Sequence, residues 1–331
     1  MSHIDLHGRP INYLRISVTD RCNLRCIYCM PEQGVPWRPH EQILRYEEIH
    51  TVVRAAAELG VQKVRLTGGE PLVRLGIADL IRTLAVVPGI DEVTMTTNGI
   101  LLSSLAGELA AAGLRRVNVS LDTLRPERFR AITRCGNIGD ALAGIAAAHA
   151  AGLEPVKINV VVMRGINDDE VVDFARRTLH EPWHVRFIEW MPVGEDGERS
   201  MDWGQGVVTA AEVRRQIEAV LGPLTAVGSM PGNGPARYFK LDSSLGTIGF
   251  ITPISEHFCF HCNRLRLTAD GQLRPCLLAD QEIDLRTALR RGADVAEIKA
   301  LIVQAIESKP LQHHLADAEH PERRAMSQIG G

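Results

Sequence analysis

The chain has 331 residues, of which 45% are hydrophobic and only 5% aromatic, so we expect a large core of aliphatic side chains. The charges nearly balance, with 37 Lys and Arg residues against 40 Asp and Glu residues, which argues against a broad basic face for nucleic acid. The sequence starts without the charged and apolar regions of an export signal, and no apolar run is long enough to cross a membrane. We therefore expect a cytoplasmic protein with no membrane partner, whose cysteines stay reduced.

Between residue 13 and about residue 220, short β-branched segments alternate with amphipathic segments rich in Ala and Leu, which is typical of βα units and a parallel sheet. The expected strands are Tyr13 to Val18, Lys63 to Thr67, Glu92 to Thr96, Arg116 to Ser120, Pro155 to Val162 and His184 to Glu189. The expected helices are Tyr46 to Leu59, Ile77 to Val86, Leu102 to Ala112, Asp140 to Ala151, Asp169 to Leu179 and Ala210 to Val220. Six units are too few for a closed eight-stranded barrel, so we expect a partial (β/α)6 TIM-type barrel, with a doubly wound sheet as the alternative.

After residue 221 the pattern changes, because Gly and Pro become frequent and several short strand-like segments follow one another. Asp270 and Gly271 are typical of a hairpin turn between two of these segments. We therefore expect an α/β protein with two domains. These are the partial barrel over residues 1–221 and a β-rich C-terminal appendage over residues 222–331, which ends in a diglycine tail.

Polar and glycine residues follow the expected strands at the point where each strand ends. The first strand runs into a cysteine loop, and the next three run into Thr67-Gly68-Gly69-Glu70-Pro71, Thr96-Thr97-Asn98-Gly99 and Ser120-Leu121-Asp122. In parallel α/β proteins, functional groups gather at the carboxyl ends of the strands. We therefore expect a functional site at this end of the sheet.

Six of the seven cysteines form two groups of three, and the first group is Cys22, Cys26 and Cys29. Three thiolates at this spacing can hold a [4Fe-4S] cube whose fourth iron has no protein ligand and stays open to a small molecule. A zinc site is the alternative, although zinc spacings normally repeat a pair of cysteines farther along the chain. An open cube would make the chain an enzyme rather than an electron carrier.

The second group is Cys259, Cys262 and Cys276, and it too has no fourth cysteine nearby. A cube at this position would also have an open iron, which can accept a nitrogen or oxygen lone pair from a substrate. A zinc site completed by His257 or His261 is the alternative. Cys135 stands apart from both groups, and we interpret it as incidental, with a surface thiol prone to oxidation as the alternative.

Arginines in the expected strands indicate an anionic ligand. Arg264 and Arg266 follow the second cysteine group and share one face, because alternate residues of a strand point the same way. Arg15 and Arg65 lie in otherwise apolar strands, where a guanidinium group is costly unless it is paired or faces a cavity. Guanidinium groups bind phosphates through paired hydrogen bonds. These residues predict a polyanion inside the barrel, and the alternative for Arg264 and Arg266 is two solvated side chains.

The CxxxCxxC loop after the first strand, together with Gly68-Gly69-Glu70-Pro71 after the second, resembles the radical S-adenosylmethionine superfamily. Thr96-Thr97-Asn98-Gly99, the second cysteine group, Asn263-Arg264-Leu265-Arg266 and the final diglycine narrow the resemblance to one family within it. That family cyclises GTP in the first step of molybdenum cofactor biosynthesis. The resemblance covers essentially the whole chain.

This resemblance implies two [4Fe-4S] clusters, one at each cysteine group, and S-adenosylmethionine as cofactors. The positions that match S-adenosylmethionine contacts in the family are Tyr28, Gly69, Ser120 and Met191. Those that match GTP contacts are Arg15, Arg65, Thr96, Lys157, Arg264, Leu265 and Arg266. Arg264, Arg266, Gly330 and Gly331 match catalytic positions, with the tail reaching into the active site, whereas the tail residues alone would suggest a mobile end.

In the family, a 5′-deoxyadenosyl radical removes the ribose 3′ hydrogen of GTP, and C3′ then attacks C8 of guanine. The product, (8S)-3′,8-cyclo-7,8-dihydroguanosine 5′-triphosphate, passes to a partner that makes cyclic pyranopterin monophosphate. A reductant protein and either a monomer or a homodimer are also expected. Two alternatives remain: a radical S-adenosylmethionine maturase that modifies peptides, which usually has more downstream cysteines, and a zinc-stabilised interaction protein.

Overall fold

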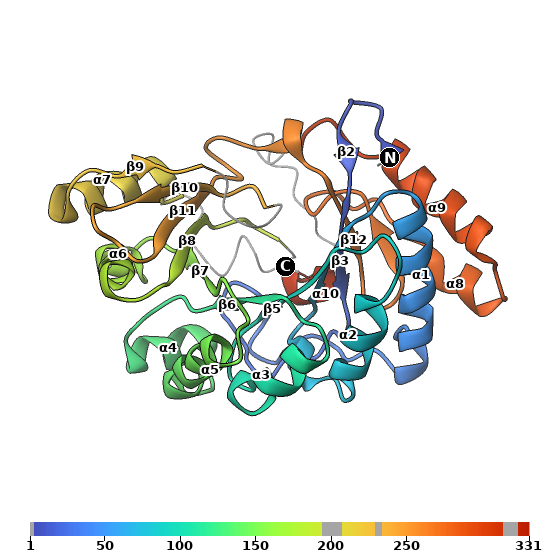
Figure 1. Ribbon diagram of the computed structural model, residues 1–331, viewed down its shortest axis with the longest axis horizontal. Coiled ribbons are helices and arrows are strands. Elements are labelled where there is room, and N and C mark those ends of the chain that lie inside the picture. Colours follow the sequence, from blue (N-terminus) through green and yellow to red (C-terminus); the bar gives the residue numbers. More distant parts are fainter. Residues whose placement is uncertain (1–2, 194–206, 229–233, 314–323, 331) are drawn as a thin grey trace.

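The computed structural model describes residues 3–193, 207–228, 234–313 and 324–330. Within these residues one sheet of 12 strands curves around a central space, with helices on its outer side (Figure 1). Six parallel neighbours form its middle: β3 (Tyr13–Ser17), β4 (Lys63–Thr67), β5 (Glu92–Thr97), β6 (Arg116–Ser120), β7 (Lys157–Val162) and β8 (His184–Glu189). All six are the strands predicted from the sequence, within two residues at each end.

The helices that connect these strands cover the outer face of the sheet. They are α1 (Tyr46–Glu58), α2 (Ile77–Ala85), α3 (Leu102–Ala111), α5 (Ile138–Ala150), α6 (Val171–His180) and α7 (Ala210–Leu221), in agreement with the predicted helices. An additional short helix, α4 (Pro126–Thr133), was not predicted, although Pro126 at its first turn is a typical helix start. The buried aliphatic side chains of strands and helices form one continuous core, because parallel strands are apolar on the face that the helices cover.

Two strands from the C-terminal part extend the parallel sheet at both edges. β12 (Arg264–Leu267) pairs with β3, and β11 (Thr247–Ile251) pairs with β8. Beyond them lie the antiparallel strands β13 (Gln272–Arg274) and β14 (Ile283–Asp284) at one edge, and β10 (Arg237–Lys240) and β9 (Thr225–Ala226) at the other. The parallel part is therefore eight strands wide but open, and the predicted partial barrel and its β-rich C-terminal part are confirmed. The predicted domain boundary at residue 221 stays a prediction.

The β12–β13 hairpin turns at Asp270 and Gly271, as predicted. It is followed by α8 (Leu285–Arg290) and α9 (Val295–Glu307), and α9 packs against α1. The N-terminal strands β1 (His3–Ile4) and β2 (Pro10–Ile11) form a separate hairpin. Among the described helices, none combines the length and the apolar character that crossing a membrane requires.

The last helix, α10 (Met326–Ile329), lies inside the curve of the sheet near the C-terminal end of the chain (Figure 1). Ile329 packs with Val193 and Leu278 in a small apolar cluster separate from the main core. Just before α10, Arg324 forms ion pairs with Asp270 and Glu282. These contacts hold residues 324–330 against the barrel, so the described part of the tail is packed rather than exposed.

Candidate active site

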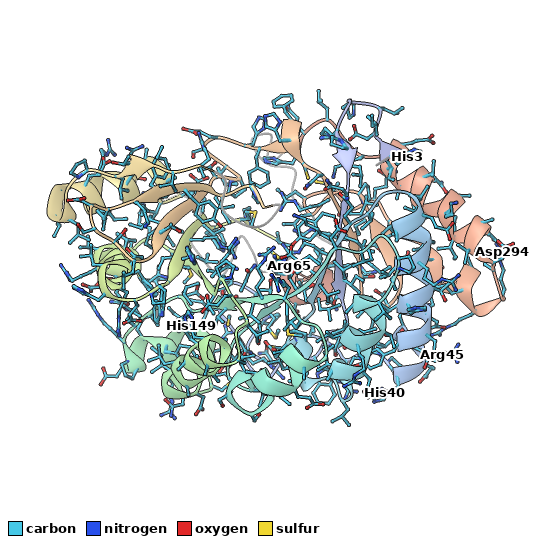
Figure 2. The ribbon with its side chains drawn as sticks, in the orientation of Figure 1. His3, His40, Arg45, Arg65, His149 and Asp294 are labelled. Atoms are coloured by element: carbon cyan, nitrogen blue, oxygen red, sulfur yellow. The ribbon has the colours of Figure 1, made fainter. Side chains whose placement is uncertain are left out.

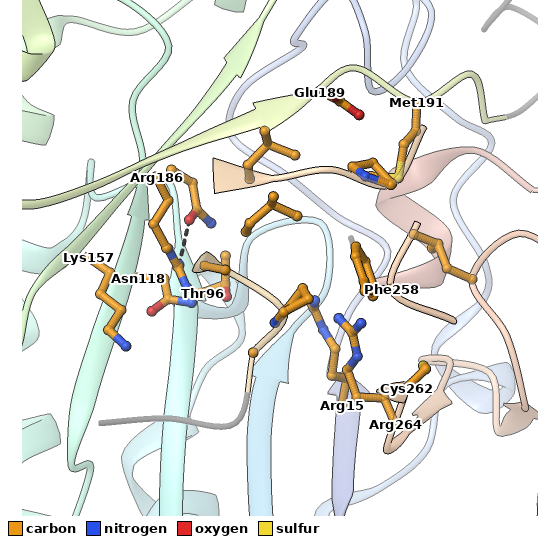
Figure 3. A pocket seen from close by; sticks show the side chains of 18 of the residues that line it. Arg15, Thr96, Asn118, Lys157, Arg186, Glu189, Met191, Phe258, Cys262 and Arg264 are labelled. Atoms are coloured by element: carbon orange, nitrogen blue, oxygen red, sulfur yellow. Dashed lines mark hydrogen bonds between the residues drawn. The ribbon is translucent and has the colours of Figure 1, made fainter. Parts of the chain in front are cut away.

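A cavity of about 640 Å³ occupies the inside of the barrel (Figure 3). Among the described residues its wall contains nine Lys and Arg side chains, and the carboxylates that line it are Asp122 and Glu189. The Lys and Arg residues are Arg15, Arg65, Arg116, Lys157, Arg186, Arg237, Arg264, Arg266 and Lys309. A concave, low-dielectric wall with this excess of positive charge concentrates anions. The cavity is therefore large and positively charged enough to accept the predicted polyanion, whose binding stays a prediction.

Three of these arginines lie side by side on neighbouring strands. Arg266 of β12 is paired in register with Arg15 of β3, which is paired with Arg65 of β4. Arg65 is buried and donates hydrogen bonds to the hydroxyl groups of Tyr13 and, at 3.4 Å, Thr96. Figure 2 places Arg65 in the middle of the barrel. A row of like charges at this spacing favours a bound anion, because the anion removes their mutual repulsion.

Burial first, and then neighbouring cations, lower the pKa values of Arg15 and Arg266 in this row. Burial and the neighbouring Arg266 lower the pKa of Arg15 well below its usual value. Burial, with Arg264 beside it, lowers the pKa of Arg266 to about 10. At a pKa of about 10, Arg266 stays protonated at neutral pH although burial and its neighbours oppose its charge.

The opposite wall, on β6, β7 and β8, carries a second cationic group that includes Lys157 and Arg186 (Figure 3). Lys157 is buried, and burial together with the nearby Arg186 and Arg116 lowers its pKa to about 6. Burial lowers the pKa of Arg186 to about 10. Lys157 can therefore gain a proton when an anion binds beside it.

The sequence analysis did not include Arg186 and Asn118 among the site residues. Asn118 is paired in register with Thr96 on one side and Lys157 on the other. It is 4% exposed, and its Oδ1 accepts no hydrogen bond from the described residues. A buried polar atom in a cavity wall without a partner is suited to a ligand donor.

The second cysteine group lies on this cavity. Cys259, Cys262 and Cys276 all line it. The first two lie in the loop before β12 and the third lies just after β13, and the β12–β13 hairpin brings these two segments together. The backbone N–H of Leu278 donates to the Cys276 sulfur at 3.4 Å. Although burial raises the pKa of Cys262, Arg264 and Lys309 lower it to about 6. This environment favours a thiolate, which is the form that binds metal.

The first cysteine group lies in the loop after β3. Burial raises the thiol pKa of Cys22 to about 11 and of Cys29 to about 12, and the charge of Cys22 adds to the shift at Cys29. The Cys22 sulfur accepts hydrogen bonds from the backbone N–H of Leu24 at 3.3 Å and from Nδ2 of Asn98 at 3.9 Å. Crowded, buried thiols with N–H donors on sulfur fit an iron-sulfur cluster, whose positive irons replace the thiol protons.

Among the residues that the structure describes, no three His, Cys, Asp or Glu side chains converge on one point that could hold a single metal ion. A [4Fe-4S] cube does not require such convergence, because each thiolate binds a different iron. The donor set of both loops therefore fits a cube with three protein ligands.

Three of the four residues that match S-adenosylmethionine contacts line the cavity: Tyr28, Ser120 and Met191. The Tyr28 hydroxyl donates to Asp122 at 2.7 Å, and Asp122 also accepts from the backbone N–H of Val161 at 2.8 Å. Burial raises the pKa of Asp122 to about 6. The Tyr28 ring is thus fixed by a buried carboxyl group that the sequence analysis left without a role.

Gly69 does not line the cavity but brings two loops together. A Cβ atom at this position would lie 2.2 Å from the carbonyl oxygen of Arg21, and the Gly69 N–H donates to Thr19 at 2.8 Å. The Gly68-Gly69-Glu70-Pro71 turn can therefore press against the cysteine loop only because this side chain is missing.

Glu70 is 1% exposed and accepts three hydrogen bonds from the protein itself. They come from the Thr97 hydroxyl at 2.7 Å and from the backbone N–H groups of Asn98 at 2.7 Å and Leu72 at 3.0 Å. Burial raises its pKa to about 7, against the effect of these bonds. In this arrangement the carboxylate fastens the loop after β5 to the glycine turn, rather than facing a ligand directly.

The remaining predicted residues are placed as follows. Thr96, Arg264 and Arg266 line the cavity, whereas Leu265 is buried in the core and does not line it. The Gly330 carbonyl oxygen accepts a hydrogen bond from Arg266 at 2.7 Å. Gly331 lies outside the described residues.

Two family models and several curated proteins match this chain. The Radical SAM superfamily model matches residues 16–178, and the Molybdenum Cofactor Synthesis C model matches residues 183–315. A protein of Pelotomaculum thermopropionicum named GTP 3′,8-cyclase is 58% identical over 328 residues, which cover 99% of each chain. One of the same name from Heliobacterium modesticaldum is 56% identical over 332 residues, with 99% of this chain and 100% of its own covered.

The chain belongs to the GTP 3′,8-cyclase family. Among solved structures, Streptococcus suis SuiB bound to S-adenosylmethionine matches 89% of this chain and 69% of its own, with a TM-score of 0.60 and 14% identity. At that identity the similarity shows the fold alone. Membership of the GTP 3′,8-cyclase family confirms the prediction of a radical S-adenosylmethionine enzyme, with S-adenosylmethionine and iron-sulfur clusters as its cofactors.

Proposed function

We propose that this chain converts GTP to 3′,8-cyclo-7,8-dihydro-GTP inside the barrel, using two iron-sulfur clusters at the two cysteine groups. The observation that carries the proposal is a single cavity with three sets of lining residues. The first set matches S-adenosylmethionine contacts, the second is the cationic wall, and the third is Cys259, Cys262 and Cys276. A reaction between two ligands requires that both reach one enclosed space.

The cationic side chains bind the triphosphate of GTP. Arg15, Arg65 and Arg266 form a row on adjacent strands, and Lys157 and Arg186 face the cavity from the opposite wall. Guanidinium groups on a rigid sheet suit phosphate oxygens, since each can donate two parallel hydrogen bonds without reorganising. Cys259, Cys262 and Cys276 would hold the second cluster by three thiolates, and such a cluster would have one iron open to the guanine edge.

The first cysteine group and the glycine turn hold S-adenosylmethionine. When bound, the reduced first cluster and S-adenosylmethionine supply the radical that removes the ribose 3′ hydrogen. The chain contributes a preformed pocket, because Asp122 fixes Tyr28 and Glu70 fixes the turn before any ligand arrives. Such fixed groups need no rearrangement during the reaction.

The described tail helps to enclose the site. Ile329 packs on Val193 and Leu278, and Gly330 contacts both Arg266 and Thr67. A reactive radical must be kept from solvent and from side reactions, and a tail packed inside the barrel serves that end. We assign Arg266 and Gly330 to catalysis on this basis and on the match with the family, and Arg264 and Gly331 on the match with the family alone.

The proposal extends to partners that follow from the reaction. A reductant protein must supply electrons to the clusters, and a synthase that makes cyclic pyranopterin monophosphate must consume the product. We also propose that the chain acts in the cytoplasm, as a monomer or homodimer.

The test incubates anaerobically reconstituted, reduced protein with S-adenosylmethionine and GTP, and measures 5′-deoxyadenosine and a cyclised nucleotide. Formation of both products in the presence of GTP supports the proposal. In the control without GTP, no cyclised nucleotide should form and the yield of 5′-deoxyadenosine should be lower. Cleavage of S-adenosylmethionine without any GTP-derived product would favour a maturase that modifies peptides. A colourless protein with zinc and no acid-labile sulfide would instead favour a zinc-stabilised interaction protein.

A further inference from the structure

A buried lysine lies where the β12–β13 hairpin meets the end of α9. Lys309 is 3% exposed, and its Nζ donates to the carbonyl oxygens of Pro275 at 2.6 Å and Arg264 at 2.9 Å. Pro275 directly precedes Cys276, and Arg264 comes two residues after Cys262. One ammonium group therefore joins the backbone next to two of the three cysteines in the second group.

Lys309 also lines the cavity wall together with Cys259, Cys262 and Cys276. Among the described residues it forms no ion pair with a carboxylate, and it donates its hydrogen bonds to the two carbonyl oxygens. A buried ammonium group without a carboxylate partner is costly unless another anionic group lies near it.

The third cysteine has a matching contact from Arg9, which is 4% exposed. Its Nη1 donates to the carbonyl oxygen of Cys259 at 2.8 Å, and its Nη1 and Nη2 donate to Leu311 at 2.9 Å and Pro310 at 2.8 Å. Pro310 and Leu311 directly follow Lys309, so Arg9 holds the lysine's own segment onto the cysteine loop. The charge of Arg9 is already balanced by Asp5, at 2.6 Å between Nε and Oδ2.

We propose that Lys309 is a positioning residue for the second iron-sulfur cluster. It orders the backbone beside Cys262 and Cys276 before the cluster assembles, and it places a positive charge that no described carboxylate pairs with next to the cluster afterwards. The inference rests on the proposed assignment of Cys259, Cys262 and Cys276 to that cluster. A nearby positive charge stabilises the reduced cluster, which is the more negative state, so its removal shifts the midpoint potential to more negative values.

The experiment isolates the second cluster by replacing Cys22, Cys26 and Cys29 with Ala in the full-length chain. Lys309→Met is compared with Lys299→Met in this background, since Lys299 is a partly exposed lysine on α9 that pairs with Glu58. Bound iron and sulfide are measured after anaerobic reconstitution at limiting iron, and the midpoint potential is measured by electron paramagnetic resonance. We expect Lys309→Met to bind about tenfold less cluster, which is the smallest effect typical of residues that contact metal ligands. The cluster that it does bind should have a more negative midpoint potential. Lys299→Met should match the parent.

If Lys309→Met has the cluster content and midpoint potential of the parent, the proposed role of Lys309 is wrong, while the cluster assignment is unaffected. A parent chain that binds no iron would overturn the cluster assignment, and with it this inference. If Lys309→Met lowers the melting temperature of the cluster-free chain, Lys309→Gln separates the effect of the charge from that loss of stability. Gln keeps a hydrogen-bond donor but has no charge. Lys309→Gln should then melt like the parent and still show the negative shift, and an unshifted midpoint would contradict the proposed role of the charge.

Discussion

The guanidinium group of Arg266 donates a hydrogen bond to the carbonyl oxygen of Gly330, at 2.7 Å between Nη1 and O. Arg266 is buried in the cavity wall, in register with Arg15, and Gly330 is the last residue of the tail that the structure describes. This contact joins the cationic row to the C-terminal end of the chain. A side chain proposed to bind GTP and a tail proposed to support catalysis are therefore parts of one arrangement.

Replacing Gly330 with Ala should displace the tail from the active site. Gly330 has a φ of 76°, and a Cβ atom would lie 2.4 Å from the Thr67 hydroxyl oxygen. We expect a loss of about tenfold or more in kcat, because a shift of the tail disturbs its contact with Arg266. Steady-state formation of the cyclised nucleotide measures this loss.

Gly152→Ala is the matched control for Gly330→Ala. Gly152 has a φ of 74°, so an Ala there is under the same backbone strain, about 1–2 kcal/mol for an L-residue. Nothing lies within 4 Å of the Cβ atom that this substitution adds. Gly152→Ala should lower the free energy of unfolding by that amount and leave kcat unchanged. Equal kcat values for the two variants would show that the tail position does not matter.

Arg266→Ala should weaken GTP binding and leave S-adenosylmethionine binding intact. Loss of hydrogen bonds from a charged group costs about 1.5–3 kcal/mol, which corresponds to about a tenfold to hundredfold rise in Kd for GTP. Arg82→Ala is the control, since Arg82 is an exposed residue of α2 that pairs with Asp79. Calorimetric titration with each ligand checks this, and equal loss of both affinities would contradict separate sites.

Lys157 should take up a proton when GTP binds. Its pKa of about 6 in the free chain leaves it mostly neutral at neutral pH, and a bound triphosphate raises that pKa. Proton uptake should therefore be present at neutral pH and fade as the pH falls below about 6, where the lysine is already charged. Calorimetry in buffers of different ionisation enthalpy measures the protons taken up. The same uptake in Lys157→Met would assign the protons to another group.

Glu70→Gln should loosen the pocket for S-adenosylmethionine. The amide nitrogen cannot accept a hydrogen bond, so a buried N–H of Asn98 or Leu72 loses its acceptor, at a cost of about 1–3 kcal/mol. We expect a fall of that size in the free energy of unfolding and weaker S-adenosylmethionine binding, with GTP affinity less affected. Urea denaturation and ligand titration measure both effects. A variant with parent stability would show that the three bonds to Glu70 contribute nothing.

The sequence predicted the central strands because each is a short apolar run followed by a glycine or polar loop. It did not reveal that β11 and β12 would flank those strands, since the pairing of distant segments has no local signal. Arg186, by contrast, had a signal that was not used. It lies between two apolar residues of a strand, as Arg15 and Arg65 do, and it lines the same cavity.

Other parts of the site depend on contacts that no short motif encodes. Lys309 acts on the cysteine loops only because the end of α9 meets the β12–β13 hairpin, 34 and 45 residues away along the chain from its two carbonyl partners. Glu70 was recognised as part of a motif, but its three partners became visible only in the structure. The position of Gly330 was expected from the family resemblance, and not from the physical properties of the tail residues.

The most direct measurement uses GTP that carries deuterium at the ribose 3′ position. The reduced protein with S-adenosylmethionine should transfer that deuterium to 5′-deoxyadenosine and form the cyclised nucleotide in equal amount. 5′-Deoxyadenosine without deuterium, or with no nucleotide product, would contradict the claim that the cavity brings the ribose of GTP to the radical.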